Sequence, residues 1–398
     1  MRWIVMLLIA AALATGRAEA QPGPWQPDRL SPGWVFTPSV VLGGLWDSNV
    51  TVRNQGNPLI QELVGIVNPR GELDYNGRHL RFNTGYSGAF EAYRNVSELN
   101  RYEQKARVST QYQASARLRA LARAAYTATP TTDRLELGTL PFIDFGGRMF
   151  DASSGLAYSV SPRTQISGEY RFQHVSFDRD RDIVRNVLLQ GGYAHSPVVN
   201  IRHSLTQRVG IGADWQYRRA IVAGGTQHFD VQSALGEVSY QIGQSTSVVG
   251  GAGVSHLAIE NTDVSMWGPT FRAGLEHEIE RTSLTLHYSK SFVPSFSFGG
   301  LSGNQEVTGA VRMPLTRTGR LQFTGSVAYS KAEPVAALGV GYGLDSWWTN
   351  WSLSYMVSPW LRTEGFVSTM HQTSTIRGNV DRTRVGIQFV TFKPVRIQ

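Results

Sequence analysis

The chain has 398 residues, with 38 Lys and Arg against 30 Asp and Glu, 41 Gly and no Cys. The absence of Cys excludes a disulfide scaffold, a Cys-ligated metal site and a thiol nucleophile. The mean hydropathy of −0.21 resembles that of a soluble protein. Abundant Gly and 11% aromatic residues, however, are also typical of a membrane β-barrel, whose hydropathy averages out because apolar and polar residues alternate along each strand.

The first twenty residues have the pattern of a secretory signal peptide. Arg2 supplies a basic start, residues 3–14 are apolar, and Ala18-Glu19-Ala20 is a small-x-small cleavage site. No later apolar run reaches the length of about 18 residues that a transmembrane helix needs. We therefore expect four parts: a signal peptide (1–20), a short periplasmic segment (21–33), a barrel (34–392) and a periplasmic C-terminal tail (393–398).

Strict alternation of side-chain type predicts β-strands with one apolar and one polar face. In residues 164–174, Ile166, Tyr170 and Phe172 fall on one face, whereas Glu169 and Arg171 fall on the other. In a transmembrane barrel the apolar face meets lipid and the polar face meets a wet lumen.

The same pattern recurs along the whole chain and predicts about 18 strands, an even number as single-chain bacterial barrels have. Short connections such as 76–77, 161–163 and 280–281 alternate with longer ones such as 49–60, 129–146 and 332–344, which is the expected difference between periplasmic turns and extracellular loops. Two predicted periplasmic links, 195–204 and 314–318, are longer than the rest. The predicted strands are 34–48, 61–75, 78–93, 100–113, 117–128, 147–160, 164–178, 182–194, 205–221, 229–242, 245–259, 265–279, 282–294, 304–313, 319–331, 345–357, 360–373 and 380–392.

Tryptophans fall near the predicted strand ends. We expect Trp46, Trp267, Trp347 and Trp348 near the outer membrane interface, and Trp34 and Trp360 near the inner one. Amphipathic rings at both interfaces form the aromatic girdles of transmembrane barrels.

The predicted inward face carries eleven cations and four anions, which indicates an anion-preferring lumen. An alternative of equal weight is that Arg–Glu pairs brace the wall. The residues predicted to line the substrate path are Arg81, Lys105, Arg107, Arg119, Arg123, Arg171, Arg208, Arg218, Arg362, Arg382, Arg384, Glu103, Glu169, Asp214 and Glu364.

No residue pattern predicts catalysis, a metal site or a cofactor. His203-Ser204 has no acid placed nearby in the sequence, and the nine His residues lack the close spacing of metal ligands. An exported chain does not meet nucleic acid. We therefore predict that the protein is not an enzyme.

Two segments resemble the beta-barrel porin family of the second type. They are Leu45-Trp46-Asp47-Ser48-Asn49-Val50 and the stretch from His203-Ser204-Leu205-Thr206 to Trp215-Gln216-Tyr217-Arg218-Arg219. The resemblance would cover residues 34–392, and it implies an 18-stranded outer-membrane barrel of a Gram-negative bacterium, often associated with exopolysaccharide export loci. Such barrels usually end on an aromatic residue, whereas here six residues follow Phe392.

Two functions follow from these observations. The first is a conduit for exopolysaccharide secretion, implied by the resemblance, with an anionic polysaccharide as cargo and a periplasmic or outer-membrane polysaccharide export protein as a partner. The alternative is a general diffusion porin for small anionic or neutral solutes, with residues 129–146 folded inward as a constriction. Either protein would have outer-membrane lipid around it.

Overall fold

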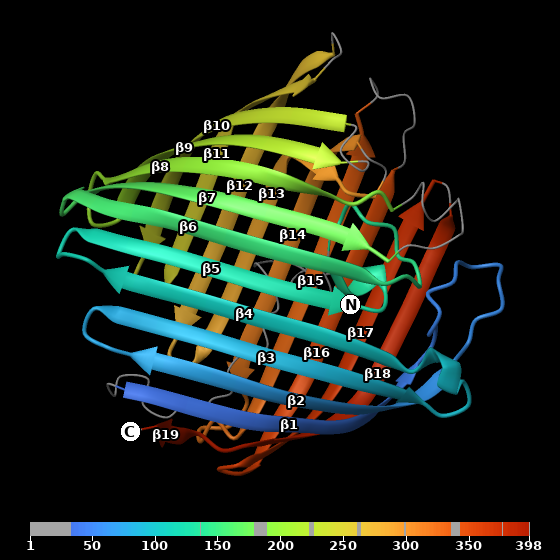
Figure 1. Cartoon of the computed structure of the whole chain (residues 1–398). Helices are drawn as coiled ribbons and strands as arrows, with labels where there is room; N and C mark the ends of the chain where they lie inside the picture. Colours follow the sequence, from blue (N-terminus) through green and yellow to red (C-terminus); the bar gives the residue numbers. More distant parts are fainter. Residues whose placement is uncertain are drawn as a thin grey trace, which may run out of the picture.

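The computed structural model describes residues 33–397 except 136, 179–188, 223–226, 261–263, 298–299, 336–342 and 376. The chain forms one closed antiparallel barrel of eighteen strands, in which β1 pairs with both β2 and β18 (Figure 1). This confirms the fold predicted from the sequence. The predicted signal peptide lies outside the described residues.

Every strand pairs with its neighbours in sequence order, and a short final strand, β19, extends the last one. The strands are β1 (Gly33–Asp47), β2 (Glu62–Asn76), β3 (Leu80–Tyr93), β4 (Arg101–Gln113), β5 (Leu118–Thr129), β6 (Gly147–Ser161), β7 (Thr164–Phe177), β8 (Gly192–Ser204), β9 (Val209–Val222), β10 (Gln227–Ile242), β11 (Thr246–Ile259), β12 (Ser265–Ile279), β13 (Thr282–Ser295), β14 (Gly300–Pro314), β15 (Leu321–Pro334), β16 (Leu344–Ser358), β17 (Leu361–Ser374), β18 (Gly378–Phe392) and β19 (Val395–Ile397). Two short 3-10 helices, η1 (Ser97–Leu99) and η2 (Thr132–Leu135), lie in the connections after β3 and β5.

The eighth strand is the main error of the sequence prediction. The prediction was 182–194, but β8 is Gly192–Ser204, and residues 182–188 lie outside the described part of the chain. Pro197 sits inside β8, opposite Tyr170, and the ladder to β9 is interrupted beside it. A proline weighs against a central strand because it cannot donate to the ladder. Residues 195–204, which were predicted to be a link, therefore belong to β8. A turn of four residues joins β8 to β9.

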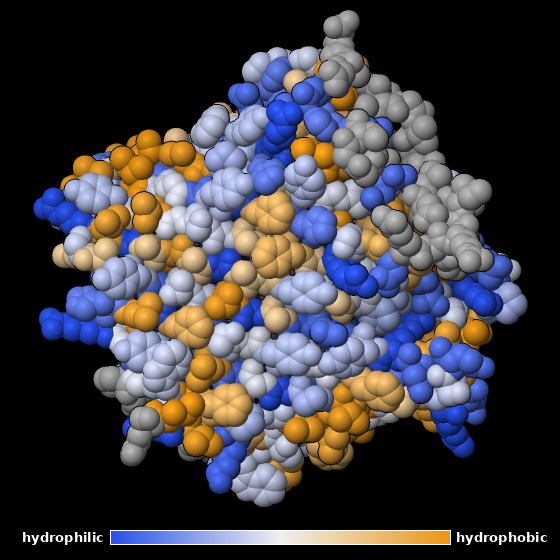
Figure 2. Space-filling view, in the orientation of Figure 1, coloured by the Kyte–Doolittle hydropathy of each residue, from blue (hydrophilic) through white to orange (hydrophobic). Residues whose placement is uncertain are grey.

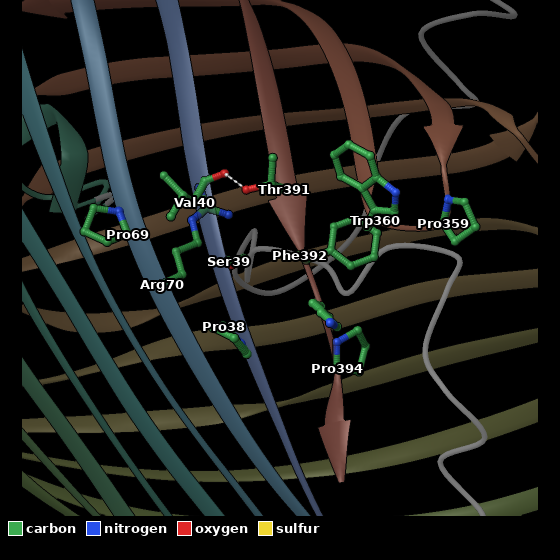
Figure 3. Close-up of a pocket in the computed structure, with 11 residues that line it drawn as sticks. Pro38, Ser39, Val40, Pro69, Arg70, Pro359, Trp360, Thr391, Phe392 and Pro394 are labelled. Atoms are coloured by element: carbon green, nitrogen blue, oxygen red, sulfur yellow. Dashed lines mark hydrogen bonds between the residues drawn. The ribbon is translucent and has the colours of Figure 1, made fainter.

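The C-terminal residues pair with the start of the first strand. Val395 lies opposite Phe36 and Phe392 opposite Ser39, so β19 continues β18 in the same register. Pro394 and Pro38 lie near the break between the two strands (Figure 3), where Pro394 cannot donate to the ladder. A groove lined by Pro38, Trp360, Phe392 and neighbouring residues lies beside this break. Pairing with β1 therefore continues past the aromatic Phe392, the last residue of β18, through β19.

The outer surface of the barrel is apolar. Leu42, Val108, Leu156, Val254 and Ile387 are each more than a third exposed, and all point away from the lumen by the alternation of their strands. Apolar side chains are spread over the visible wall (Figure 2). Wall strands of 12–16 residues exceed the 9–11 tilted residues that cross a bilayer. No helix in the described residues is long and apolar enough to span a membrane.

The connections differ in length between the two ends of the barrel. At one end, the turn end, the gaps between strands are short, as between β6 and β7 or β12 and β13. At the other end, the loop end, the connection from β5 to β6 spans residues 130–146 and the one from β1 to β2 spans 48–61. The long β5–β6 connection is the one that shapes the interior.

Candidate functional site: the interior of the barrel

One connection runs through the lumen and contacts distant strands. The inner loop, residues 130–146, bonds to β18 through Asp133, to β3 and β4 through Arg134, and to the β13–β14 connection through Thr139. These partners lie far apart around the closed sheet, so the loop reaches them only by crossing the interior. Its buried residues show that it occupies the loop end of the lumen.

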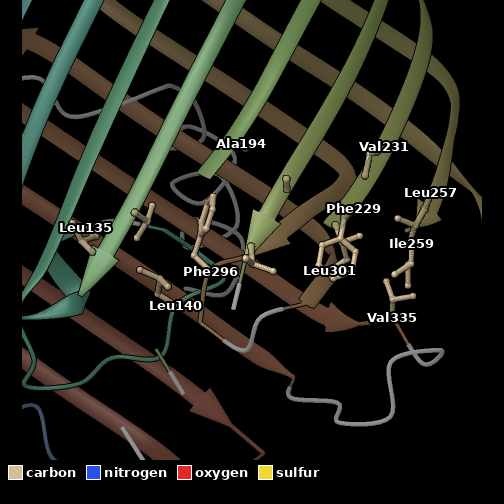
Figure 4. Packing of buried hydrophobic residues seen from close by; sticks show 13 residues of the cluster. Leu135, Leu140, Ala194, Phe229, Val231, Leu257, Ile259, Phe296, Leu301 and Val335 are labelled. Atoms are coloured by element: carbon tan, nitrogen blue, oxygen red, sulfur yellow. The ribbon is translucent and has the colours of Figure 1, made fainter. Parts of the chain in front are cut away.

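The apolar part of the inner loop packs against one side of the wall. Leu140 is fully buried in a cluster with Phe229 and Leu257 of the wall and with Phe296 and Leu301 (Figure 4). Burying side chains of this size contributes roughly 1.5–3 kcal/mol each. This cluster closes the loop end on the side of β7 to β14.

Hydrogen bonds between the side chain of Gln372 and the main chain of the loop hold the middle of the loop against β16 and β17. Gln372 is 1% exposed; its Oε1 accepts from the Phe142 N–H at 2.6 Å, and its Nε2 donates to the Leu140 carbonyl at 2.8 Å. Phe142 packs on Trp348 with ring centroids 5.5 Å apart. Trp348 therefore faces the interior, and its predicted place in the outer girdle is wrong. Trp46, Trp267 and Trp347 are exposed on the outer face as expected.

Charged side chains anchor the other part of the loop in a continuous chain of ion pairs. We call it the anchor network; it links, in order, Asp133, Arg382, Asp47, Arg384, Glu91, Arg134, Glu103 and Lys105. Its central pair, Arg382 and Asp47, is fully buried, with Nη2 and Oδ2 2.6 Å apart. Cations and anions alternate and are equal in number, so the network is neutral.

The acids of the anchor network keep the loop arginine charged. Burial alone would lower the pKa of Arg134, but Glu91 and Glu103 together raise it well above its ordinary value. Arg134 donates to Glu91 at 2.7 Å and to Glu103 at 2.8 Å. Removing one partner from a buried ion pair typically costs about 3–5 kcal/mol, because the other charge stays buried without compensation. The inner loop is thus fixed in place.

The first segment that resembles the porin family closes the barrel at the loop end. Asp47 holds Arg382 of β18, and the Ser48 N–H donates to the Thr383 carbonyl at 2.9 Å. Asn49 donates to the Asp381 carbonyl at 2.9 Å, and Val50 is fully buried. This segment therefore joins the first strand to the last.

The sequence analysis did not identify the anchor network as a unit. Arg382, Arg384, Glu103 and Lys105 were predicted to line a substrate path, and their partners Asp47, Glu91, Asp133 and Arg134 were not singled out. Asp47 lies in the segment 45–50 that resembles the porin family but carries no charge pattern of its own, and the two loop residues follow no strand alternation. Of these four partners, only Glu91 could be placed inward from the sequence, because it falls on the polar face of the predicted strand 78–93 together with Arg81.

Strand register places fourteen of the fifteen predicted residues on the inward face, and Arg208 lies in the turn between β8 and β9. For example, Arg81 shares its strand face with Glu91, and Arg123 connects through Ser109 and Asn83 to the same face of β3. Lumen-facing orientation alone does not make a residue part of a substrate path, and that role remains a prediction.

A second group, in the wall, consists of arginines with few acid partners. Arg123, Arg171 and Arg218 lie on alternate strands β5, β7 and β9, on one register row with Ser153 and Ser196 between them. We call them the arginine row. Glu169 accepts from Arg171 at 2.7 Å and from Arg123 at 3.4 Å. The side chains of Arg171 and Arg123 are 51% and 64% exposed and Arg218 is partly exposed, whereas the central pair of the anchor network is fully buried.

The remaining predicted residues are paired on the wall or lie near the turn end. Arg107 bonds Glu72 at 2.9 Å, Asp214 bonds Arg272 at 2.7 Å, and Arg362 lies 3.8 Å from Glu364. Arg81 and Arg208 are exposed, and Arg119 is partly exposed. These three have no ion pair with any described residue.

The positive surplus of the inner wall is smaller than the predicted set suggested. Strand register adds ten inward carboxylates and six inward arginines, and it leaves out Arg208, which lies in the turn before β9, so the surplus of seven falls to two. The added carboxylates are Asp47, Glu62, Glu72, Asp74, Glu91, Asp151, Glu237, Glu276, Glu278 and Glu306, and the added arginines are Arg70, Arg101, Arg202, Arg272, Arg312 and Arg396. The distribution of charge along the wall therefore matters more than its sum.

No arrangement in the described residues suggests catalysis or metal binding. No group of three or more His, Cys, Asp or Glu side chains there could hold a metal ion. His203, which the sequence placed in a link, lies in β8, and its Nδ1 is 2.9 Å from the Thr164 hydroxyl oxygen. That contact joins two wall strands.

Comparison with known proteins finds likeness only among solved structures. No family model and no curated protein matches the chain. OccK1 (OpdK) of Pseudomonas aeruginosa is 10% identical, with a TM-score of 0.44 over 90% of this chain and 99% of that one. OccAB4 of Acinetobacter baumannii is 8% identical, with a TM-score of 0.46 over 92% and 100%. The siderophore receptor PirA of P. aeruginosa is 8% identical, with a TM-score of 0.40 over 91% and 81%. The functional interpretation therefore rests on the geometry of this chain.

Proposed function

We propose that the protein is a passive channel for small solutes in the outer membrane of a Gram-negative bacterium. The observation that carries the proposal is a closed barrel with an apolar outer face and a charged inner wall, narrowed by an anchored inner loop. Barrels of 16–18 strands leave an aqueous lumen rather than a core filled by side chains. The inner loop then limits the size of what passes.

The exopolysaccharide conduit implied by the family resemblance has less support. A polysaccharide chain needs a continuous wide path, whereas the inner loop crosses the loop end and is held by buried ion pairs and by Gln372. Opening such a path would mean breaking several of these interactions together. The same loop fits the alternative of a porin whose 129–146 segment forms a constriction.

A size-exclusion measurement tests the proposal. Purified protein is placed in liposomes, and swelling rates are compared for neutral sugars from monosaccharide to tetrasaccharide. We expect rates to fall steeply with sugar size and to rise for the larger sugars when residues 134–143 are replaced by a short Gly-Ser linker. Liposomes that stay impermeable to a monosaccharide with both proteins would contradict the channel. Equal rates for all sugars with the native chain would contradict the constriction.

The membrane orientation of the wall has its own test. Val108 faces outward and Ser109, its neighbour on β4, faces inward opposite Arg123. An Arg in the lipid midplane costs roughly 2–4 kcal/mol, and less near the interfaces. We expect Val108→Arg to lower the free energy of unfolding in phospholipid vesicles by an amount of this order, and Ser109→Arg to change it far less. Equal losses would show that the faces are assigned wrongly.

A further inference from the structure

We propose that the arginine row is a binding site for small carboxylate-bearing or phosphate-bearing solutes, centred between Arg171 and Arg218. This inference deepens the proposed channel function and rests on it for the route by which a solute arrives. The anchor network does not offer such a site, because it is neutral, largely buried and already filled by its own partners.

Geometry brings the three arginines together on one line across the strands. Arg123 lies opposite Ser153, Ser153 opposite Arg171, and Arg171 opposite Ser196. The Arg218 Nε then donates to the Ser196 hydroxyl at 3.3 Å. Strands are about 4.8 Å apart, so successive arginine backbones are roughly 10 Å apart. Two long side chains at this spacing can contact one small anion from two sides.

The charges of the row are incompletely compensated. Glu169 is the one carboxylate in the described chain that pairs with Arg123 or Arg171, and it serves both. No described carboxylate pairs with Arg218, which donates to the neutral Ser196. Three cations against one anion leave a local excess on a wall that is otherwise nearly balanced.

A further donor faces the same space without a partner. Gln216 precedes Arg218 by two residues on β9 and so shares its inward face, opposite Ser233. Its Nε2 is buried and makes no hydrogen bond with any described residue. A buried donor without an acceptor is destabilising by about 1–3 kcal/mol. An oxyanion held by Arg218 would supply an acceptor on the face where Gln216 lacks one.

The chemistry of the donors specifies the class of ligand. Arginine presents a planar fork of N–H donors that matches carboxylate and phosphate oxygens, and such charge-assisted hydrogen bonds are about twice as strong as neutral ones. Ser196 and Gln216 can bond the remaining oxygen atoms. Neutral solutes gain nothing from the two guanidinium groups, so the site discriminates by charge and by planar oxygen geometry.

The test measures binding and passage separately. Succinate and inorganic phosphate are the probes, with glucose as the neutral control. Single-channel current in KCl is recorded while each probe is added, and binding to the detergent-solubilised protein is measured by titration calorimetry. Arg171→Gln/Arg218→Gln is compared with Arg81→Gln/Arg208→Gln, which removes the same charge from exposed arginines near the turn end. Retained heat-modifiable gel migration shows that each variant is folded.

We expect both anions to reduce the current of the native channel, and the row variant to raise their half-saturating concentration about tenfold or more, equivalent to about 1.4 kcal/mol. The control variant should change that concentration less than about twofold. Equal shifts in the two variants would overturn the site in favour of a general field effect. Calorimetric binding by a chain that never conducts would retain the site and refute the channel. Absence of binding in a chain that conducts would refute the site and retain the channel.

Discussion

The anchor network and the arginine row use the same residue type for different purposes within one barrel. In the anchor network, Arg382 is fully buried and contacts both Asp47 and Asp133. In the arginine row, Arg171 is half exposed and shares a single Glu169 with Arg123. Complete pairing fixes the inner loop to the wall, whereas incomplete pairing leaves cations available to a solute. The two regions therefore differ in how many acid partners each arginine has and in how deeply its side chain is buried.

The largest expected effect comes from the anchor network. Arg382→Gln would leave Asp47 and Asp133 buried without their shared partner. We expect a loss of about 3–5 kcal/mol in the free energy of unfolding, measured by denaturant titration in vesicles. Arg208→Gln, which removes an exposed cation of the turn between β8 and β9, is the matched control and should cost less than about 1 kcal/mol. A loss for Arg382→Gln as small as that of the control would mean that the network does not anchor the loop.

A smaller effect is expected where neutral hydrogen bonds hold the same loop. Gln372→Ala removes the acceptor of the Phe142 N–H and the donor to the Leu140 carbonyl. Leaving these buried groups unsatisfied should cost roughly 1–3 kcal/mol. We also expect more current fluctuation in single-channel records, because the middle of the loop loses its attachment. Gln322, a partly exposed residue of β15 opposite Ser354, provides the control Gln322→Ala. An unchanged stability for Gln372→Ala would contradict the attachment.

The smallest effect on stability is expected in the arginine row. Arg171→Gln removes an ion pair that water already screens, and exposed pairs contribute about 0–1 kcal/mol. Unfolding in vesicles should therefore change by less than about 1 kcal/mol, although ion selectivity changes. A loss as large as that of Arg382→Gln would show that the row braces the wall and would remove the contrast between the two regions.

Alternation predicted the barrel well because a strand of a membrane barrel has one lipid face and one wet face. Val108 and Ser109 illustrate how a period of two assigns neighbouring residues to opposite faces. The prediction was wrong at β8, where Pro197 interrupts the ladder. Trp348 was also misplaced: it follows the outward-facing Trp347 on β16, so alternation turns it inward, where it contacts Phe142 of the inner loop.

The candidate site could be predicted only in part. Alternation selected the inward face that holds Arg123, Arg171 and Arg218, but their common row depends on the register between strands, which local pattern does not contain. The anchor network could not be predicted from the sequence, because Asp133 and Arg134 lie in a loop. They contact β18 and β3 only once the barrel has closed. The sequence leaves open whether the inward arginines brace the wall or select anions. In the structure the arginines of the anchor network are braced by acids, and those of the arginine row are the ones that we propose to bind solutes.

The reversal potential of a single channel under a KCl gradient tests the central claim most directly. We expect the native chain to conduct with a preference for chloride over potassium that weakens as salt rises, because screening acts within about 8–10 Å at physiological ionic strength. Arg171→Gln/Arg218→Gln should move the reversal potential toward zero, whereas Arg81→Gln/Arg208→Gln should move it less. A native channel that prefers potassium, or a row variant with the native reversal potential, would contradict the assignment of these arginines to solute passage.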